Sequence, residues 1–298
     1  MDERYQALLA CPRCHGDLRF EASSCTCARC GAVFRVEAEI PLLDDNAVSR
    51  DARIADEVHA QKHAHAMYVD DRSVLNKWEE GVLERILEWL GDASTPVLDV
   101  GCGVGHLGRT ANALGREVDL VGFDLMAELL MEATVGYGAL IEGDIHRMPF
   151  QDASFSTMVL SNTLHHVADR TSALRELLRV LSPGGVIVCY DPRRVPPIEA
   201  VKSLVRRHHE AFSEHHDAFA PEEYRKMLED AGLEVDRYVA VDPIGPLLAT
   251  AMDMVRAGSV FGPEQIASVL VATDRAVERW DRKGGAGLML LARARKPA

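Results

Sequence analysis

Residues 97–108, VLDVGCGVGHLG, decide the fold because they join an apolar strand to the start of a helix through a glycine-rich turn. Gly103, Gly105 and Gly108 fit the G-x-G-x-x-G spacing of dinucleotide-binding loops, and Gly101 extends the pattern toward the strand. Glycine lets the backbone pass close to a ligand, and the following helix offers free N–H groups at its N-terminus. The stretch therefore predicts a site for a nicotinamide dinucleotide or for another ligand that contains adenosine.

Strand-like and helix-like segments alternate outward from this turn. Strands are predicted at 96–100, 118–124, 139–145, 156–162, 185–191, 233–241 and 287–295. Helices are predicted at 72–92, 106–115, 126–135, 168–181 and 220–232. This order indicates an α/β, Rossmann-like fold, with a mostly parallel seven-stranded sheet and helices on both faces. Residues 244–283 add two apolar-faced helices, for which a lid, a dimer surface, a pocket wall and ordinary core packing all stay open.

Three aspartates end successive predicted strands, at the edge where such sheets bind ligands. Asp124 follows Gly105 by nineteen residues, and its carboxylate suits a ribose diol in either kind of cofactor. Asp99 would repel a pyrophosphate, whereas S-adenosylmethionine carries only an ammonium and a sulfonium group beside its carboxylate. One such aspartate alone would be read as a cap or turn residue. Together with Asp144, the three favour S-adenosylmethionine.

The segments VLDVGCGVGHLG, VGFD, EGDIHRMPF, STMVLSNTLHHV and LLRVLSPGGVIVCYD resemble the successive motifs of class I S-adenosylmethionine-dependent methyltransferases. The resemblance covers roughly residues 70 to 240 and departs at Ser156, where the family often has an acid. It implies that Asp124 binds the ribose, that Asp144 faces the adenine amino group, and that Asn162 lies under the methionine end. The implied cofactor contacts are Asp99, Gly101, Gly103, Gly105, Asp124, Leu125, Met126, Asp144, Ile145 and Asn162.

His165 and His166 end the fourth strand of the predicted sheet and are the candidate catalytic residues. Methyl transfer from a sulfonium needs no acid, and a base is needed only where the acceptor must lose a proton, as a hydroxyl does. Either histidine could be that base, or the pair could only shape the pocket. Asn162 is followed by TLHH, and not by the Pro-Pro-aromatic run of many enzymes that methylate nucleobase or glutamine amino groups.

The first 45 residues contain two C-x2-C pairs twelve residues apart, at Cys11, Cys14, Cys27 and Cys30. Four thiolates on two tight turns suit one tetrahedral zinc ion, in a closed and therefore structural site. Cys25 is an alternative to Cys27, which we prefer because it restores the C-x2-C spacing. The segment resembles the small zinc ribbons that act as activators or leading modules of some methyltransferases.

We therefore expect a zinc ribbon at 1–45, a polar linker at 46–71 and a methyltransferase domain at 72–298. The net charge of −13 argues against broad nucleic-acid binding, and the basic stretch at 193–209 is read as a solvated helix face. Neither a signal peptide nor an apolar run of membrane-spanning length is found, so a cytoplasmic location is expected.

The expected function is methyl transfer to a small organic acceptor, such as a secondary metabolite, by a chain that is a candidate homodimer. An rRNA or tRNA methyltransferase that holds RNA through its ribbon is the first alternative. A non-catalytic binding or scaffold protein on the same fold is the second. The sequence leaves open the methylated atom and whether zinc serves activity or only folding.

Overall fold

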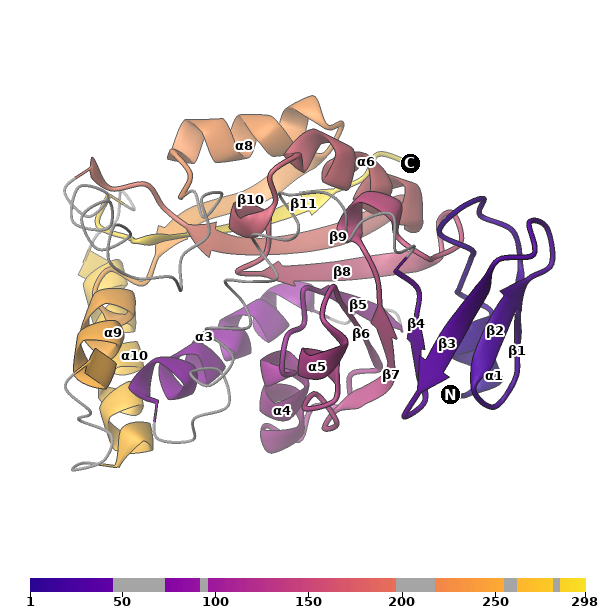
Figure 1. Ribbon diagram of the computed structural model, residues 1–298. Helices are drawn as coiled ribbons and strands as arrows, with labels where there is room; N and C mark the ends of the chain where they lie inside the picture. The colour runs from indigo at the N-terminus through magenta and orange to yellow at the C-terminus, as the bar shows by residue number, and fades with distance from the viewer. Residues whose placement is uncertain (45–72, 92–95, 197–217, 255–261, 281–284) are drawn as a thin grey trace.

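A computed structural model describes residues 1–44, 73–91, 96–196, 218–254, 262–280 and 285–298 (Figure 1). The expected linker at 46–71 and most of the basic stretch at 193–209 lie outside these ranges. Within them, no helix is both long enough and apolar enough to cross a membrane.

The central sheet has the seven strands that the sequence predicts, in the order β7-β6-β5-β8-β9-β11-β10. Only β11 runs antiparallel to its neighbours, so the prediction of a mostly parallel sheet is confirmed. Its strands are β5 (Val97–Val100), β6 (Leu120–Asp124), β7 (Tyr137–Glu142), β8 (Phe155–Ser161), β9 (Leu181–Pro192), β10 (Glu234–Val241) and β11 (Met289–Arg295).

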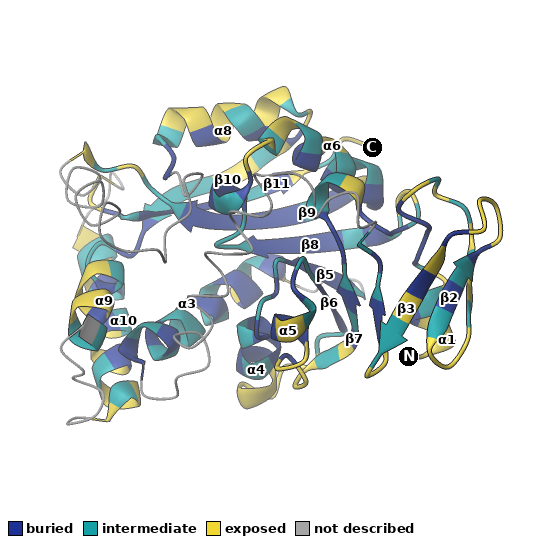
Figure 2. Ribbon diagram, viewed as in Figure 1, coloured by how far each residue is buried: buried dark blue, intermediate teal, exposed yellow. Residues whose placement is uncertain are grey.

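Helices cover both faces of this sheet, which is why all four residues of β5 are buried (Figure 2). In Figure 1, α6 and α8 lie above the sheet, whereas α3 and α4 lie below it. The pair α9 and α10 packs against α3, so the two helices predicted within 244–283 are present. The helices are α3 (Val74–Leu90), α4 (His106–Ala113), α5 (Ala127–Leu130), α6 (Arg170–Val180), α8 (Pro221–Asp230), α9 (Gly245–Met254) and α10 (Pro263–Trp280).

The prediction of a helix over 126–135 was wrong in its length, because α5 ends at Leu130. Gly136 has φ +85°, and a Cβ there would lie 2.4 Å from the carbonyl oxygen of Gly108. The chain therefore turns out of the helix and passes against α4 before it enters β7. Thr134 and Val135, both β-branched, add little helix propensity to oppose this turn.

The N-terminal residues form a small antiparallel sheet that continues the central one. The sheet consists of β1 (Leu18–Phe20), β2 (Ser24–Cys27), β3 (Val33–Glu37) and β4 (Ile40–Leu42), and the short helix α1 (Glu3–Gln6) precedes it. Strand β4 pairs in parallel with β7 at Leu42 and Glu142, so one sheet of eleven strands runs through the molecule. Behind β4, Ile40 packs in one apolar cluster with Cys102 and Leu130.

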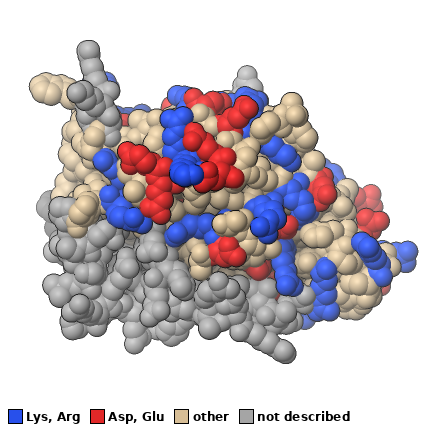
Figure 3. Space-filling model, turned by 90° about the horizontal axis from the view of Figure 1, so that it is seen from above, with Lys and Arg blue, Asp and Glu red and all other residues tan. Residues whose placement is uncertain are grey.

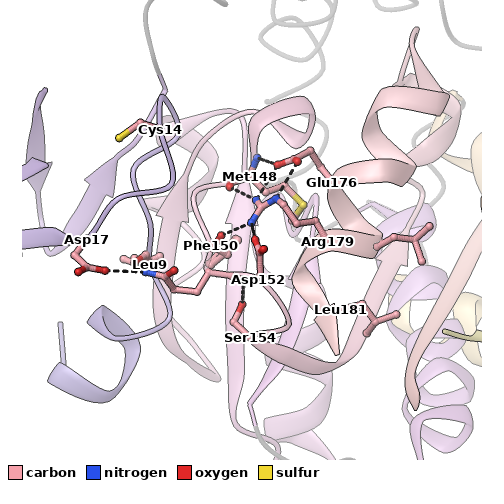
Figure 4. A network of polar contacts seen from close by, with 12 residues as sticks. Leu9, Cys14, Asp17, Met148, Phe150, Asp152, Ser154, Glu176, Arg179 and Leu181 are labelled. Carbon is pink, nitrogen blue, oxygen red and sulfur yellow. Dashed lines mark hydrogen bonds and ion pairs between the residues drawn. The ribbon is translucent and has the colours of Figure 1, made fainter. Parts of the chain in front are cut away.

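Hydrogen bonds at residues 149–151 add a second junction between the ribbon and the sheet (Figure 4). The backbone N–H of Ala10 donates to the Pro149 carbonyl, and that of Gln151 donates to the Leu8 carbonyl, both at 2.8 Å. Arg179 of α6 donates to the Phe150 carbonyl at 2.7 Å and so fixes the same loop from the other side. The N-terminal residues are therefore joined to the rest of the molecule at two places, at the edge strand β7 and at the connection that precedes β8.

Candidate functional site

The glycine turn after β5 adopts a backbone that other residues rarely adopt. Gly101, Gly103 and Gly105 have φ of +71°, +52° and +82°. A Cβ on Gly105 would lie 2.9 Å from the Cα of Ala133, and one on Gly101 would lie 2.5 Å from the Thr163 hydroxyl oxygen. The turn thus leads directly to the open N-terminus of α4 and brings residues 161–163 beside the loop.

We expect Gly105→Ala to weaken binding of an adenosine ligand at least tenfold, because positive φ and a backbone contact at 2.9 Å both oppose a Cβ. Gly115→Ala is the matched control, since Gly115 also has positive φ but a Cβ added to it would meet no atom within 4 Å. The control should cost about 1 to 2 kcal/mol in stability and leave affinity unchanged. Calorimetric titration with S-adenosylhomocysteine measures the affinity and denaturant unfolding the stability. Equal losses of affinity in the two variants would contradict the role of the loop.

Asp124 ends β6 and holds the glycine turn in place. Its Oδ2 accepts the N–H of Gly103 at 2.9 Å, and its Oδ1 accepts the N–H of Met126 at 3.0 Å. Burial raises the pKa of Asp124, while these N–H groups partly offset that rise. Each carboxylate oxygen retains a further lone pair, so a diol can still bind. Met126 is buried, and Leu125 is partly exposed.

Asp144 lies beside Asp124, because the Gly143 N–H donates to the Asp124 carbonyl at 3.0 Å. Its side chain caps the short 3-10 turn η2 (Ile145–Arg147) and lies 2.7 Å from Nδ1 of His146. Burial lowers the pKa of His146, but the hydrogen bond and charge of Asp144 give a net upward shift. Sequence reasoning missed His146, which the spacing of two residues from Asp144 could have indicated.

Asp99 is the last residue but one of β5 and is 3% exposed. Its Oδ2 accepts the hydroxyl hydrogen of Tyr137 at 2.6 Å, and the same hydroxyl oxygen accepts the Gly108 N–H at 3.3 Å. Burial raises the pKa of Asp99 to about 7. One oxygen of this carboxylate therefore joins β5 to β7, and Tyr137 is a site residue that the sequence did not point to.

Asn162 follows β8 in a left-handed conformation, with φ +54°. Its backbone N–H donates to the Tyr190 carbonyl at 2.7 Å, and its side-chain amide donates to Oε1 of Glu79 at 3.4 Å. Glu79 comes from α3, and burial raises its pKa to about 7. The sequence held a signal for Glu79, because an acid at 79 stands in line with the apolar residues Leu75 and Val82.

The two candidate catalytic histidines lie in the 3-10 turn η3 (Leu164–His166) and have different surroundings. His165 is 3% exposed, and its Nδ1 lies 2.9 Å from Oδ1 of Asp191. Tyr224 donates its hydroxyl hydrogen to Oδ2 of the same aspartate at 2.7 Å. His166 is partly exposed, and its ring lies 4.0 Å from that of His165. His166 is the candidate that a ligand can reach more directly.

The four predicted metal ligands form one cluster, in which the Sγ atoms of Cys11, Cys14, Cys27 and Cys30 lie within 4.8 Å of one another. The Sγ atoms of Cys11 and Cys30 are 3.7 Å apart, and those of Cys14 and Cys27 are 3.5 Å apart. A tetrahedral zinc ion with Zn–S bonds of about 2.3 Å requires about 3.8 Å between sulfurs, so the geometry fits. Cys25 is buried outside the cluster, which supports Cys27 as the ligand.

In a comparison with known protein families, the model described as a methyltransferase domain matches residues 98–189. An uncharacterised 37.1 kDa protein from transposon TN4556 of Streptomyces fradiae is 40% identical over 32% of this chain and 29% of its own length. Demethylmenaquinone methyltransferase of Staphylococcus aureus is 32% identical over 41% of this chain and 53% of the enzyme. The chain thus spans about half or less of the length of these curated relatives.

One similar solved chain comes from the complex between the Haloferax volcanii Trm112 methyltransferase activator and a methyltransferase. It covers 80% of this chain and 98% of its own length, with a TM-score of 0.53. At 18% identity, this likeness concerns the fold alone.

Proposed function

Residues 98–189 belong to the S-adenosylmethionine-dependent methyltransferase domains, and from this premise we propose that the chain methylates a small organic acceptor. The observation that carries the proposal is the glycine turn held open by Asp124. Its left-handed glycines, the free N-terminus of α4 and two carboxylates meet at the carboxyl edge of a parallel sheet. Asp99 and Asp124 would both repel a phosphate group, so the site favours S-adenosylmethionine over a dinucleotide.

The donor occupies the edge formed by β5, β6, β7 and β8 in this proposal. Asp124 binds its ribose hydroxyls, and Leu125 and Met126 pack near its adenine. Asp144 faces the adenine amino group and Ile145 lies beside the ring, while the glycines and Asn162 line the methionine end. The hydrogen bonds that join Gly103, Asp124 and Gly143 support this arrangement, because they bring its parts together without a ligand.

S-adenosylmethionine, when bound, supplies a methyl group on a positively charged sulfur. The protein aligns the acceptor with the carbon–sulfur bond and excludes water, and such placement can supply most of the rate enhancement. For a hydroxyl acceptor, His166 takes the proton as the oxygen–carbon bond forms and the electrons of the broken bond remain on sulfur. His165, held by Asp191, keeps the neighbouring ring in position.

The charge on the surface around α8 favours a small acceptor over RNA, because RNA binding requires a continuous basic surface. On the face that carries α8, basic and acidic side chains are mixed (Figure 3). Several of them form ion pairs on that helix, such as Arg225 with Glu229 and Lys226 with Asp230. The curated relative that is a demethylmenaquinone methyltransferase, by its name, also acts on a small molecule.

The four-cysteine cluster is proposed to hold one structural zinc ion. All four thiolates serve as ligands, which leaves no open position for water or substrate. The ribbon then acts on the methyltransferase domain through β4 and β7, as a support for the edge of the sheet.

Calorimetric titration with S-adenosylmethionine, S-adenosylhomocysteine and NAD tests the donor site. We expect micromolar binding of the first two, no binding of NAD, and at least a tenfold loss with Asp124→Ala, because that carboxylate holds both the loop and the ribose. Asp230→Ala is the control, since Asp230 lies on the exposed face of α8. Binding of NAD alone would overturn the proposal, and RNA binding that falls steeply with salt would redirect the acceptor to RNA.

A further inference from the structure

Glu79 is a half-buried ionisable residue of α3, on the side of the helix that also carries the buried residues Asn76 and Val82. Its neighbours along α3, Trp78 and Val82, are 2% and 4% exposed. Glutamate is rarely buried unless it is paired or hydrogen-bonded. The carboxylate of Glu79 accepts a hydrogen bond from the amide of Asn162, at 3.4 Å, and no ion pair within 4.0 Å involves it in the described part of the chain.

Three carboxylates gather at the donor site, and within the described ranges neither a lysine nor an arginine forms an ion pair with any of them. Asp99, Asp124 and Glu79 all approach the carboxyl ends of β5, β6 and β8. Among the described residues, none of these three carboxylates forms an ion pair, whereas other buried acids such as Asp242 lie beside an arginine. Burial raises the pKa of all three, which is the expected result of unbalanced carboxylates in a desolvated site. The site is therefore suited to a cationic ligand.

Two of the three carboxylates already have other tasks. Asp124 accepts two backbone N–H groups and is proposed to bind the ribose. Asp99 has one oxygen occupied by the Tyr137 hydroxyl. Within the described ranges, Glu79 is held through Oε1 by one amide, which leaves its other carboxylate oxygen open to a ligand. It also lies next to Asn162, the residue assigned to the methionine end.

We propose that Glu79 accepts a hydrogen bond from the α-ammonium group of S-adenosylmethionine and thereby positions the methionine end of the donor. This inference rests on the proposed function. Asn162 is the orienting residue, because its left-handed backbone directs the side-chain amide to Oε1 of Glu79. A charge-assisted bond to an ammonium group is stronger than one between neutral groups, so the contribution to donor affinity is large.

The test uses two ligands that differ only in this group, S-adenosylhomocysteine and its analogue with hydrogen in place of the α-ammonium. Glu79→Gln keeps the shape and the bond to Asn162 but removes the charge. We expect at least a tenfold loss of affinity for S-adenosylhomocysteine and less than a twofold change for the analogue. Glu88→Gln, an exposed position on the same helix, should change neither affinity.

Equal losses for the two ligands, or no loss for either, would overturn the assignment of Glu79 while leaving the donor site intact. A folded wild-type protein that binds neither ligand would instead overturn the proposed function, and this inference with it. Thermal unfolding of the Glu79→Gln variant, measured alongside, shows whether α3 has kept its packing.

Discussion

Loss of metal from the four-cysteine cluster is expected to unfold residues 1–44 and to destabilise the sheet that they extend. Structural zinc contributes about 10 to 16 kcal/mol in small zinc-finger peptides, far more than a single apolar contact. The ribbon has little core of its own, and Tyr5, Leu9 and Phe34 share one apolar cluster with Phe123 of β6. Unfolding the ribbon therefore also removes cover from the central sheet.

Strand β7 should respond most strongly, because β4 is its neighbour at the edge. The Leu43 N–H donates to the Glu142 carbonyl at 3.0 Å, and Tyr5 lies directly against Gly138. Without these partners β7 becomes an exposed edge strand, which is prone to association with other chains. Faster amide hydrogen exchange is expected in β7 after chelation, with a smaller change in β9, which is separated from β7 by β6, β5 and β8.

Two cysteines on one strand make a matched pair for this prediction. Cys27→Ala removes a ligand, whereas Cys25→Ala changes a buried thiol outside the cluster. We expect the first variant to lose its zinc and several kcal/mol of stability, and the second to keep about one zinc per chain and lose about 1 kcal/mol. Metal analysis with thermal unfolding decides between them. A zinc-free wild type of unchanged stability would show that the ribbon folds on its core alone.

Local patterns in the sequence were sufficient to predict the strands and the glycine turn. The strands show as short apolar segments that alternate with helix-like segments, and the turn shows as closely spaced glycines, of which Gly101 has φ +71°. The cysteine ligands followed from spacing, and the cluster contains Cys27 as expected. The roles of these residues in binding donor or metal stay predictions.

Contacts between distant segments could not be predicted in this way. Tyr137 meets Asp99 only because β7 and β5 lie on either side of β6 in the folded sheet. The pairing of β4 with β7 joins residues a hundred positions apart, and the sequence carried no pattern for it. Glu79 had a signal in the helix period, but its partner Asn162 came from the topology.

Asp191 and its hydrogen-bond partners His165 and Tyr224 are the subject of the second prediction, a large loss of folding stability. Asp191 has no exposed surface and accepts hydrogen bonds from the His165 N–H at 3.1 Å and the Tyr224 hydroxyl at 2.7 Å. Its Oδ1 also lies 2.9 Å from Nδ1 of His165. The carboxylate of Asp191, on β9, thus connects η3 to α8. The turn η3 follows β8 and begins two residues after Asn162.

Asp191→Ala should lower the free energy of unfolding by about 3 to 5 kcal/mol, because it leaves several buried donors without an acceptor. Asp191→Asn is the control, since its amide oxygen can accept the His165 N–H and its NH2 group can donate to Tyr224. Burial raises the pKa of Asp191 to about 7, which makes a neutral replacement tolerable, and we expect a loss of about 1 kcal/mol.

Denaturant unfolding of the two variants, with S-adenosylhomocysteine affinity measured on each, separates packing from positioning. Freed from Asp191, η3 should no longer fix Asn162 and His166, so Asp191→Ala should also bind the ligand several-fold more weakly than Asp191→Asn. Equal stability of the two variants would mean that water or neighbouring groups replace the carboxylate. Unchanged affinity in a destabilised Asp191→Ala protein would mean that the Asp191 group supports the fold without positioning the donor site.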